Sequence, residues 1–162
     1  MDVALVSVEG IAVASDIEIS SATGDFRQAT DLETAIKLSL FLNARARPGD
    51  RLPSGETGFG SNLGGWWGEA YLPDGGQFGS RLWTLKRSSL SQETRQKARD
   101  FSLEALRWMI DSGIATSTPV TVSIPERGVL GILVEPTRGD QVLARFEYLW
   151  EAISGSYRSV NQ

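Results

Sequence analysis

The residues of this sequence that come closest to a catalytic pattern are carboxylates in a glycine-rich stretch that also carries tryptophan. Glu56, Glu69 and Asp74 lie in that stretch, together with the adjacent Trp66 and Trp67. A glycosidase needs two carboxyl groups on either side of the sugar bond that it cleaves, and aromatic platforms often flank them. Acids in a long polar loop are more often simply solvated. One hypothesis is therefore a peptidoglycan-acting muramidase or glycan binder that uses Trp66, Trp67, Glu56 and Glu69.

Most other catalytic chemistries are excluded by the residue types that the chain lacks. It contains no histidine and no cysteine, so His-based triads, cysteine nucleophiles, zinc sites with thiolate or imidazole ligands and disulfides are impossible. The Gly-x-Ser-x-Gly and Gly-x-x-x-x-Gly-Lys-[Ser/Thr] patterns do not occur, and neither does an Asp-rich calcium loop. We therefore expect no enzyme activity, no cofactor and no metal.

Protein recognition fits the same stretch better. The segment from Gly64 to Trp83, GGWWGEAYLPDGGQFGSRLW, holds three of the five tryptophans and six of the seventeen glycines. Interface hot spots favour Trp, Tyr and Arg, while glycine allows turns with positive φ and a close approach of a partner's backbone. For Trp83 a core position is an equally good interpretation. The predicted interface residues are Trp66, Trp67, Tyr71, Arg81 and Trp83.

Two helices are predicted around this stretch. Residues 31–46 carry an apolar stripe. Thr30, just before this segment, and Glu33, within it, have the spacing of a capping box. Residues 91–112 give the stronger helical pattern, with Ser91 as a good N-cap. This second helix is polar all round at its start and nearly apolar all round at its end. We therefore expect it to begin in solvent and to end in the core.

From residue 120 onward the spacing of apolar residues changes from 3.6 to 2, which is typical of strands. Residues 120–124, 130–134 and 142–150 alternate, and turns rich in proline and glycine separate them. They predict a three-stranded antiparallel meander with one face available to pack on the long helix. Residues 1–20 alternate more weakly and predict a small hairpin that turns at Glu9-Gly10.

The predicted fold class is therefore α+β, with one long and one shorter helix packed on an antiparallel β-meander and a long Gly/Trp-rich loop. A length of 162 residues suits a single domain over residues 1–162. Trp108 and Trp150 lie on apolar faces of the predicted elements, so we expect both in the core.

Charge and hydropathy argue against a nucleic-acid or membrane partner. The net charge is −4 and the isoelectric point is about 4.9, whereas nucleic-acid binders usually carry a basic face. No apolar run approaches the roughly 18–20 residues of a membrane span, and the N-terminus begins with an acid rather than a basic leader region. We expect a soluble protein made in a cytoplasm, with no nucleic acid, no membrane and no small-molecule substrate among its partners.

Three motifs resemble, in the same order, the small baseplate-wedge proteins of Mu-like contractile-tailed bacteriophages. They are Gly65-Trp66-Trp67-Gly68-Glu69, Gly79-Ser80-Arg81-Leu82-Trp83 and the helix end from Glu104 to Gly113. The resemblance covers residues 31–135, and it is specific because two Trp-bearing loops and a capped helix must coincide. The family often has a basic pair before its Gly-Trp-Trp, where this chain has Asn62-Leu63-Gly64.

The resemblance implies a non-enzymatic structural subunit of a contractile-tail baseplate wedge. Proteins of this kind are similar to the lysozyme-like small wedge protein of T-even-type phages, sit where wedge, central hub and tail sheath meet, and are thought to help start sheath polymerisation. The implied partners are other baseplate wedge, hub and tail-sheath proteins. The implied location is the virion tail baseplate, assembled in the host cytoplasm. The alternative remains a peptidoglycan-acting muramidase or glycan-binding tail protein.

Overall fold

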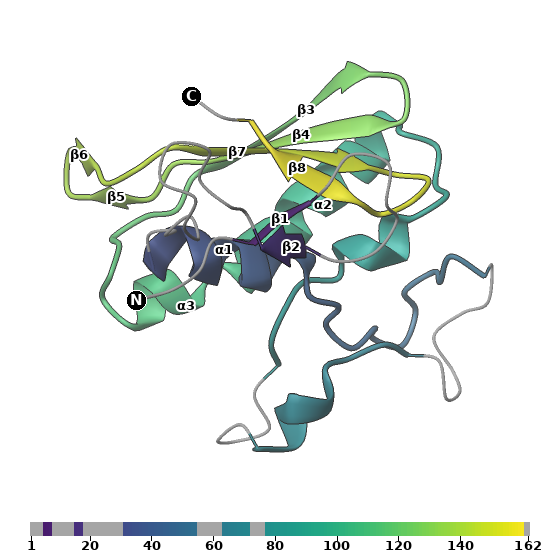
Figure 1. Cartoon of the computed structure of the whole chain (residues 1–162), viewed down its shortest axis with the longest axis horizontal. Helices are drawn as coiled ribbons and strands as arrows, with labels where there is room; N and C mark the ends of the chain where they lie inside the picture. Colours follow the sequence, from purple (N-terminus) through teal and green to yellow (C-terminus); the bar gives the residue numbers. More distant parts are fainter. Residues whose placement is uncertain (1–4, 8–14, 18–30, 55–62, 72–76, 161–162) are drawn as a thin grey trace.

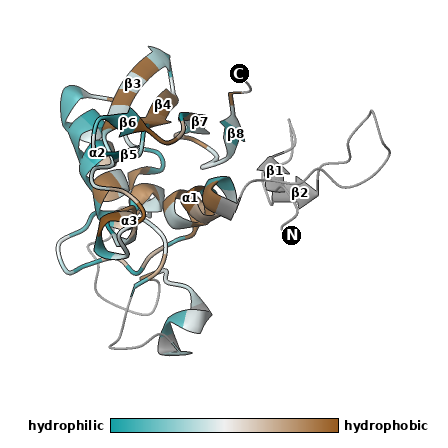
Figure 2. Cartoon of the chain, turned by 90° about the vertical axis from the view of Figure 1, so that its left-hand side faces the viewer, coloured by the Kyte–Doolittle hydropathy of each residue, from teal (hydrophilic) through white to brown (hydrophobic). Residues whose placement is uncertain are grey.

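A computed structural model describes residues 5–7, 15–17, 31–54, 63–71 and 77–160 of the chain. In Figure 1 a sheet lies over a layer of helices, and the chain between the first two long helices extends below that layer, away from the sheet. Figure 2 shows the same arrangement from a second side. The lowest part of this extension contains residues 63–71. Residues 63–71 and 77–85 together are called the Gly/Trp loop. The fold class α+β is confirmed, and the single domain stays a prediction.

The first helix, α1 (Asp31–Phe41), is shorter than predicted because its end is pulled into a tertiary pairing. Beyond the helix the backbone bonds to Ser80, whose N–H donates to the Leu42 carbonyl at 2.9 Å and whose carbonyl accepts from the Ala44 N–H at 2.9 Å. These main-chain groups are satisfied across the fold instead of along a helix. The predicted cap, Thr30, lies outside the described residues.

The predicted helix over 91–112 is two helices, so that prediction was wrong at its C-terminal end. The helix α2 spans Gln92–Ala105 and a single turn, α3, spans Trp108–Asp111. Ser91 caps α2 as predicted, because its Oγ accepts from the Thr94 N–H at 3.2 Å. Between the helices the Arg107 N–H bonds three residues back, to the Glu104 carbonyl at 3.3 Å, which tightens the turn.

The break between α2 and α3 lets the chain contact α1. The indole Nε1 of Trp108 donates to Ser39 Oγ on α1 at 2.9 Å, which places the ring at the edge of the core rather than in its centre. Leu106 and Met109, on either side of Trp108, are fully buried. Gly113 ends α3 with a φ of +73°, as the sequence predicts for a helix C-terminus.

The main sheet has four antiparallel strands in the order β3-β4-β7-β8. They span Val120–Glu126 (β3), Val129–Val134 (β4), Phe146–Glu151 (β7) and Tyr157–Ser159 (β8). The first three confirm the predicted meander. The fourth was not predicted; its Tyr157 ring stacks on Phe41 of α1 with ring centroids 3.7 Å apart, a contact that no local pattern announces.

Two short hairpins form two-stranded sheets of their own. The strands β5 (Thr137–Arg138) and β6 (Gln141–Val142) pair with each other, so the predicted third strand begins at Phe146 instead of residue 142. At the N-terminus β1 (Leu5–Ser7) pairs with β2 (Ser15–Ile17), which confirms a hairpin there. Its predicted turn, Glu9-Gly10, lies outside the described residues.

One face of the main sheet forms the core with the helices. The strand register places Val122, Ile132 and Tyr148 side by side on this face, and all three are buried. Trp150, on the same face, is 2% exposed, which confirms its predicted core position. Burial of such a side chain contributes roughly 1.5–3 kcal/mol. The hydropathy colouring of Figure 2 shows hydrophobic residues on β3, β4 and α1.

The described helices include two short 3-10 turns in the Gly/Trp loop, η1 (Trp67–Tyr71) and η3 (Leu82–Leu85). No helix within the described ranges is long and apolar enough to cross a bilayer.

Candidate protein interface

The second half of the Gly/Trp loop, residues 77–85, is attached to the end of α1 by its backbone. Gly79 has a φ of +95°, and a Cβ at this position would lie 2.4 Å from the Leu42 carbonyl oxygen. A side chain therefore cannot be accommodated without moving the main chain. Directly after it, the buried Ser80 donates its hydroxyl to the Leu40 carbonyl and so satisfies a group at the open end of the helix.

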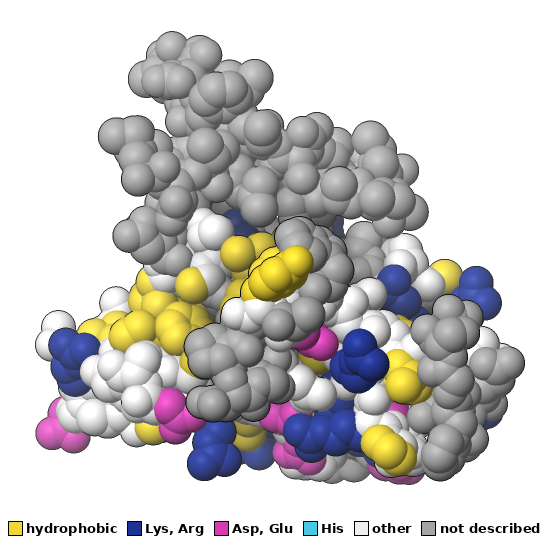
Figure 3. Space-filling model, turned by 90° about the horizontal axis from the view of Figure 1, so that it is seen from below, with side chains coloured by type: hydrophobic (Ala, Val, Ile, Leu, Met, Phe, Trp, Pro, Cys, Tyr) yellow, Lys and Arg dark blue, Asp and Glu magenta, His cyan; other side chains and the backbone are white. Residues whose placement is uncertain are grey.

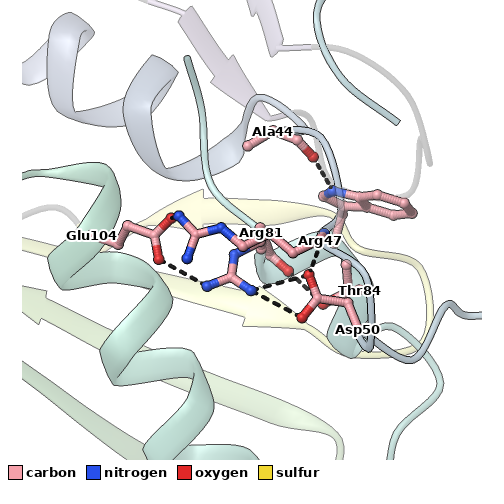
Figure 4. A network of polar contacts seen from close by, with 7 residues as sticks. Ala44, Arg47, Asp50, Arg81, Thr84 and Glu104 are labelled. Atoms are coloured by element: carbon pink, nitrogen blue, oxygen red, sulfur yellow. Dashed lines mark hydrogen bonds and ion pairs between the residues drawn. The ribbon is translucent and has the colours of Figure 1, made fainter. Parts of the chain in front are cut away.

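Arg81 is the centre of a charged network beneath the loop, drawn in Figure 4. Its Nη1 lies 2.9 Å from Asp50 Oδ1 and its Nη2 lies 2.8 Å from Glu104 Oε2 on α2. Arg47 adds a second cation, with its Nη2 2.6 Å from Glu104 Oε1 and its backbone N–H donating to Asp50. The network thus joins three segments that are far apart in the sequence.

The environment of Arg81 is mostly protein. Its side chain is only 11% exposed, and its guanidinium lies over the Phe101 ring with 4.2 Å between Cζ and the ring centroid. Burial alone would lower the pKa of Arg81, but the hydrogen bonds and charges of Glu104 and Asp50 outweigh burial and raise the pKa. Within the described part of the chain its buried Nε has no hydrogen-bond acceptor.

Trp83 links the two halves of the loop. Its indole Nε1 donates to the Ala44 carbonyl at 2.7 Å, and the face of its ring lies so close to Gly64 that a Cβ there would be 2.5 Å from Cζ2. The neighbouring Leu82 is fully buried in the hydrophobic core. Of the two interpretations of Trp83, the internal position is the one that these contacts describe.

In the first half of the loop, residues 63–71, Trp66 lies on a glycine. A Cβ on Gly68 would be 2.3 Å from the Trp66 ring, so the ring rests directly on the backbone of η1. The ring also contacts Phe78, with centroids 5.8 Å apart and planes tilted by 52°. Trp66 is half-buried by these contacts and keeps part of its surface accessible.

Tyr71, at the end of η1, is the most exposed large hydrophobic residue of the described chain, with 81% of its surface accessible. The side chain of Trp67 lies outside the described residues, although its backbone begins η1. Seen from the side of the loop, Figure 3 shows hydrophobic side chains next to Lys, Arg, Asp and Glu side chains rather than a surface of one kind. Mixed surfaces with aromatic groups are typical of protein interfaces.

The carboxylates considered for glycosidase chemistry are only partly described. Glu69 is 13% exposed and lies 3.9 Å from Arg45 Nε, at the limit of an ion pair. Glu56 and Asp74 lie outside the described residues, so no pair with Glu69 is described. No group of acids within the described residues is arranged to hold a metal ion.

The predicted interface residues therefore divide into two groups. Arg81 and Trp83 have internal partners in the 77–85 half, whereas Trp66 and Tyr71 in the 63–71 half keep accessible surface. A role in an interface stays a prediction for all five.

The residues that hold the loop, Asp50, Glu104 and Ser80, were not identified from the sequence. They come from three separate segments of the chain. The one available signal was the position of Arg81 immediately before the apolar Leu82 and Trp83, where a charge needs partners.

Comparisons with known proteins give a family and two named relatives. The sequence profile of the family described as phage protein GP46 matches residues 32–142. The Mu-like prophage FluMu protein gp46 of Haemophilus influenzae is 38% identical over 99 residues, which are 61% of this chain and 62% of that relative. The baseplate protein gp46 of Escherichia phage Mu is 32% identical over 117 residues, which are 72% of this chain and 77% of that relative.

The chain thus spans less than two thirds of the Haemophilus protein's length. The profile match runs from the start of α1 through both halves of the Gly/Trp loop to β6. It includes Arg81 with its partners Asp50 and Glu104, and it ends before β7 and β8. The matched region is therefore the part of the fold that supports the loop.

Proposed function

This chain belongs to the phage protein GP46 family, and from that membership we propose that it is a non-enzymatic structural subunit of a phage tail baseplate. The family predicted from the three sequence motifs is confirmed. One relative is named a baseplate protein of phage Mu and the other a Mu-like prophage protein. By that relationship the chain acts in the virion tail baseplate, where it binds neighbouring baseplate proteins instead of a substrate.

The observation that carries this proposal is the construction of the Gly/Trp loop. Its 77–85 half is fixed to the end of α1 by Ser80 and to α2 by the Arg81 network. On this support the 63–71 half presents Tyr71 at 81% exposure. A large aromatic side chain on an anchored support is typical of an interface hot spot. We assign the partner contact to Trp66, Trp67 and Tyr71, and we assign Arg81 and Trp83 to holding the loop.

A finer proposal concerns the position of the subunit. We place it in the wedge of a contractile tail, in contact with hub and sheath proteins, where it helps to initiate sheath assembly. The main sheet supports this, because β3 is an edge strand with β4 on one side and no strand on the other among the described residues. On β3 the Val120 carbonyl accepts a hydrogen bond from Arg99 Nε at 3.2 Å. An edge of this kind can accept a partner's strand.

Antibody labelling of tail particles tests the coarse role. Particles would be purified from a lysate of the strain that carries the gene, and a gold-conjugated antibody against this chain would be located by electron microscopy. The proposal predicts label at the baseplate end of the tail. Label absent from intact tails, or distributed along the sheath, would contradict it.

A deletion of the gene tests the finer role. If the subunit helps to start the sheath, the deletion strain should yield no sheathed tails, and a plasmid copy should restore them. Normal sheathed tails in the deletion strain would contradict sheath initiation, even with the baseplate location confirmed. Cell-wall lysis by the purified chain that disappears in Glu69→Gln would instead favour the muramidase alternative.

A further inference from the structure

A second surface of the molecule has a chemistry that the loop does not explain. A groove of about 550 Å³ lies between residues 49–53, the turn after η3 and the first turns of α2. Leu52, Leu85 and Phe101 contribute its apolar lining. Its charged lining residues are Asp50, Arg51, Lys86, Arg87, Glu93 and Lys97.

Both acids of this groove already have partners. Asp50 binds Arg81 with 2.9 Å between Oδ1 and Nη1, and Glu93 binds Lys97 with 2.7 Å between Oε1 and Nζ. Within the described part of the chain, Arg51, Lys86 and Arg87 make no ion pair or side-chain hydrogen bond. The charge of the groove that is left after these ion pairs is therefore positive, although the whole chain has a net charge of −4.

The backbone holds two of these cations in place. Arg87 has a φ of 61°, the one positive value outside glycine in the described chain, and its N–H donates to the Ala152 carbonyl at 2.8 Å. A left-handed conformation is unfavourable for a residue with a Cβ. Such strain is found most often at binding sites.

Lys86 is positioned by a glycine of the β7–β8 turn. A Cβ on Gly155 would lie 1.7 Å from Lys86 Cε, so the lysine stem packs directly on the Gly155 backbone. The ammonium Nζ lies close to the same glycine, and among the described residues no acid binds it. Ser88 and Ser89, which follow in the chain, also line the groove and add hydroxyl donors.

We propose that this groove docks an acidic, extended segment of a partner protein. Carboxylates of the segment bind Arg51, Lys86 and Arg87, the serine hydroxyls donate further hydrogen bonds, and an apolar side chain covers Phe101. A peptide fits better than a nucleic acid, because phosphate backbones need a more extended basic face and are repelled by the net negative chain. The inference rests on the groove alone and not on the baseplate role.

Fluorescence anisotropy with the full chain tests this docking. The probe is a short labelled peptide of alternating Glu and Ala, with an alternating Lys and Ala peptide as its negative control. We expect the acidic probe to bind at low ionic strength and to be released by salt. Arg87→Glu and Lys86→Glu should each weaken binding by at least about tenfold, the usual effect of losing a charge-assisted bond.

Arg127→Glu is the matched control, because Arg127 is an exposed cation in the β3–β4 turn and its change of charge is the same. Equal loss of binding in Arg127→Glu, or no binding of the acidic probe to the wild-type chain, would overturn the proposal. Thermal melting shows whether each variant is folded. Should Arg87→Glu unfold, Arg51→Glu provides the same comparison from the opposite side of the groove.

Two further outcomes would replace the proposed occupant. A single-stranded DNA oligonucleotide that displaces the acidic probe at equal charge would assign the groove to nucleic acid. Residues 1–26 carry five acids and no Lys or Arg, so a second copy of the chain is another acidic source. Salt-sensitive self-association in ultracentrifugation that is lost in Arg87→Glu would assign the groove to that copy and overturn a separate partner.

Discussion

Residues 63–71 and residues 77–85 both combine glycine, tryptophan and charged side chains, yet they are held in different ways. In 77–85 the charged Arg81 and the indole of Trp83 bond to partners in other segments, at Asp50, Glu104 and Ala44. In 63–71 the contacts are mostly within the loop, such as the Trp66 ring on Gly68. The same residue types therefore bond to other segments in one half and keep accessible surface in the other.

The difference teaches that a motif rich in Trp, Arg and Gly is not by itself an interface. Whether such a motif supports the fold or contacts a partner depends on whether its polar atoms have hydrogen-bond partners inside the chain. The two Arg81 ion pairs and the Trp83 hydrogen bond satisfy groups that a partner would otherwise have to satisfy. Substitutions in the two halves should therefore differ in their effect on stability, which can be measured against a core residue.

Replacement of the core residue Trp150 by alanine should have the largest effect. Its side chain is 2% exposed on the inner face of β7, and truncation of such a residue costs about 3–5 kcal/mol. Chemical denaturation would measure the loss in the free energy of unfolding. A loss within the range expected of surface substitutions, about 0.5 kcal/mol, would mean that the inner face of the sheet is wrongly assigned.

Arg81→Ala should destabilise the chain by about 3 kcal/mol, because it leaves the carboxylate of Asp50 without its cation in a nearly buried position. Arg47→Ala is the matched control. It also removes an ion pair to Glu104, but its side chain is 52% exposed, so the loss should be about 0–1 kcal/mol. Equal losses in the two variants, measured by urea unfolding, would contradict the structural role of Arg81.

Gly79→Ala should cost about 2 kcal/mol, from both its positive φ and the contact with the Leu42 carbonyl. Gly49→Ala isolates the first cause, since Gly49 also has a φ of +95° but its Cβ would meet nothing within 4 Å. We expect the Gly49 variant to lose only the conformational part, about 1 kcal/mol. Differential scanning calorimetry of the two variants checks that Gly79→Ala loses more stability than Gly49→Ala. An equal fall in Tm would contradict this order.

Tyr71→Ala should have the smallest effect on stability, within about 0.5 kcal/mol, because the side chain is mostly in solvent. Its effect on assembly should be large, at least about 2 kcal/mol of binding if Tyr71 is a hot spot. Melting of the free chain and recovery of the variant in purified tails give the two readouts. A variant that melts normally and is recovered at the wild-type level would remove Tyr71 from the interface.

The sequence predicted those parts of the fold that follow from local patterns. Ser91 as a cap, Gly113 as a helix end and the alternation in β3, β4 and β7 all appear in the structure. Each depends on residues within a few positions of one another, so a single sequence contains the necessary information.

The parts that were missed depend on contacts between distant residues. The early end of α1 comes from pairing with Ser80, and β8 is fixed by the stacking of Tyr157 on Phe41. Likewise, the importance of Arg81 was recognised from its residue type, but its partners were not, because Asp50 and Glu104 come from other segments. No local pattern records such pairings. Arg81 was therefore predicted to contact a partner protein.

Hydrogen exchange of backbone amides, compared between the free chain and assembled tails, tests the division of the Gly/Trp loop most directly. We predict that amides of residues 79–85 exchange slowly in both states, because Ser80 and Thr84 N–H groups are already bonded inside the chain. Amides of residues 63–71 should exchange faster in the free chain and become protected on assembly. Protection that appears in 79–85 while 63–71 stays unchanged would contradict the account.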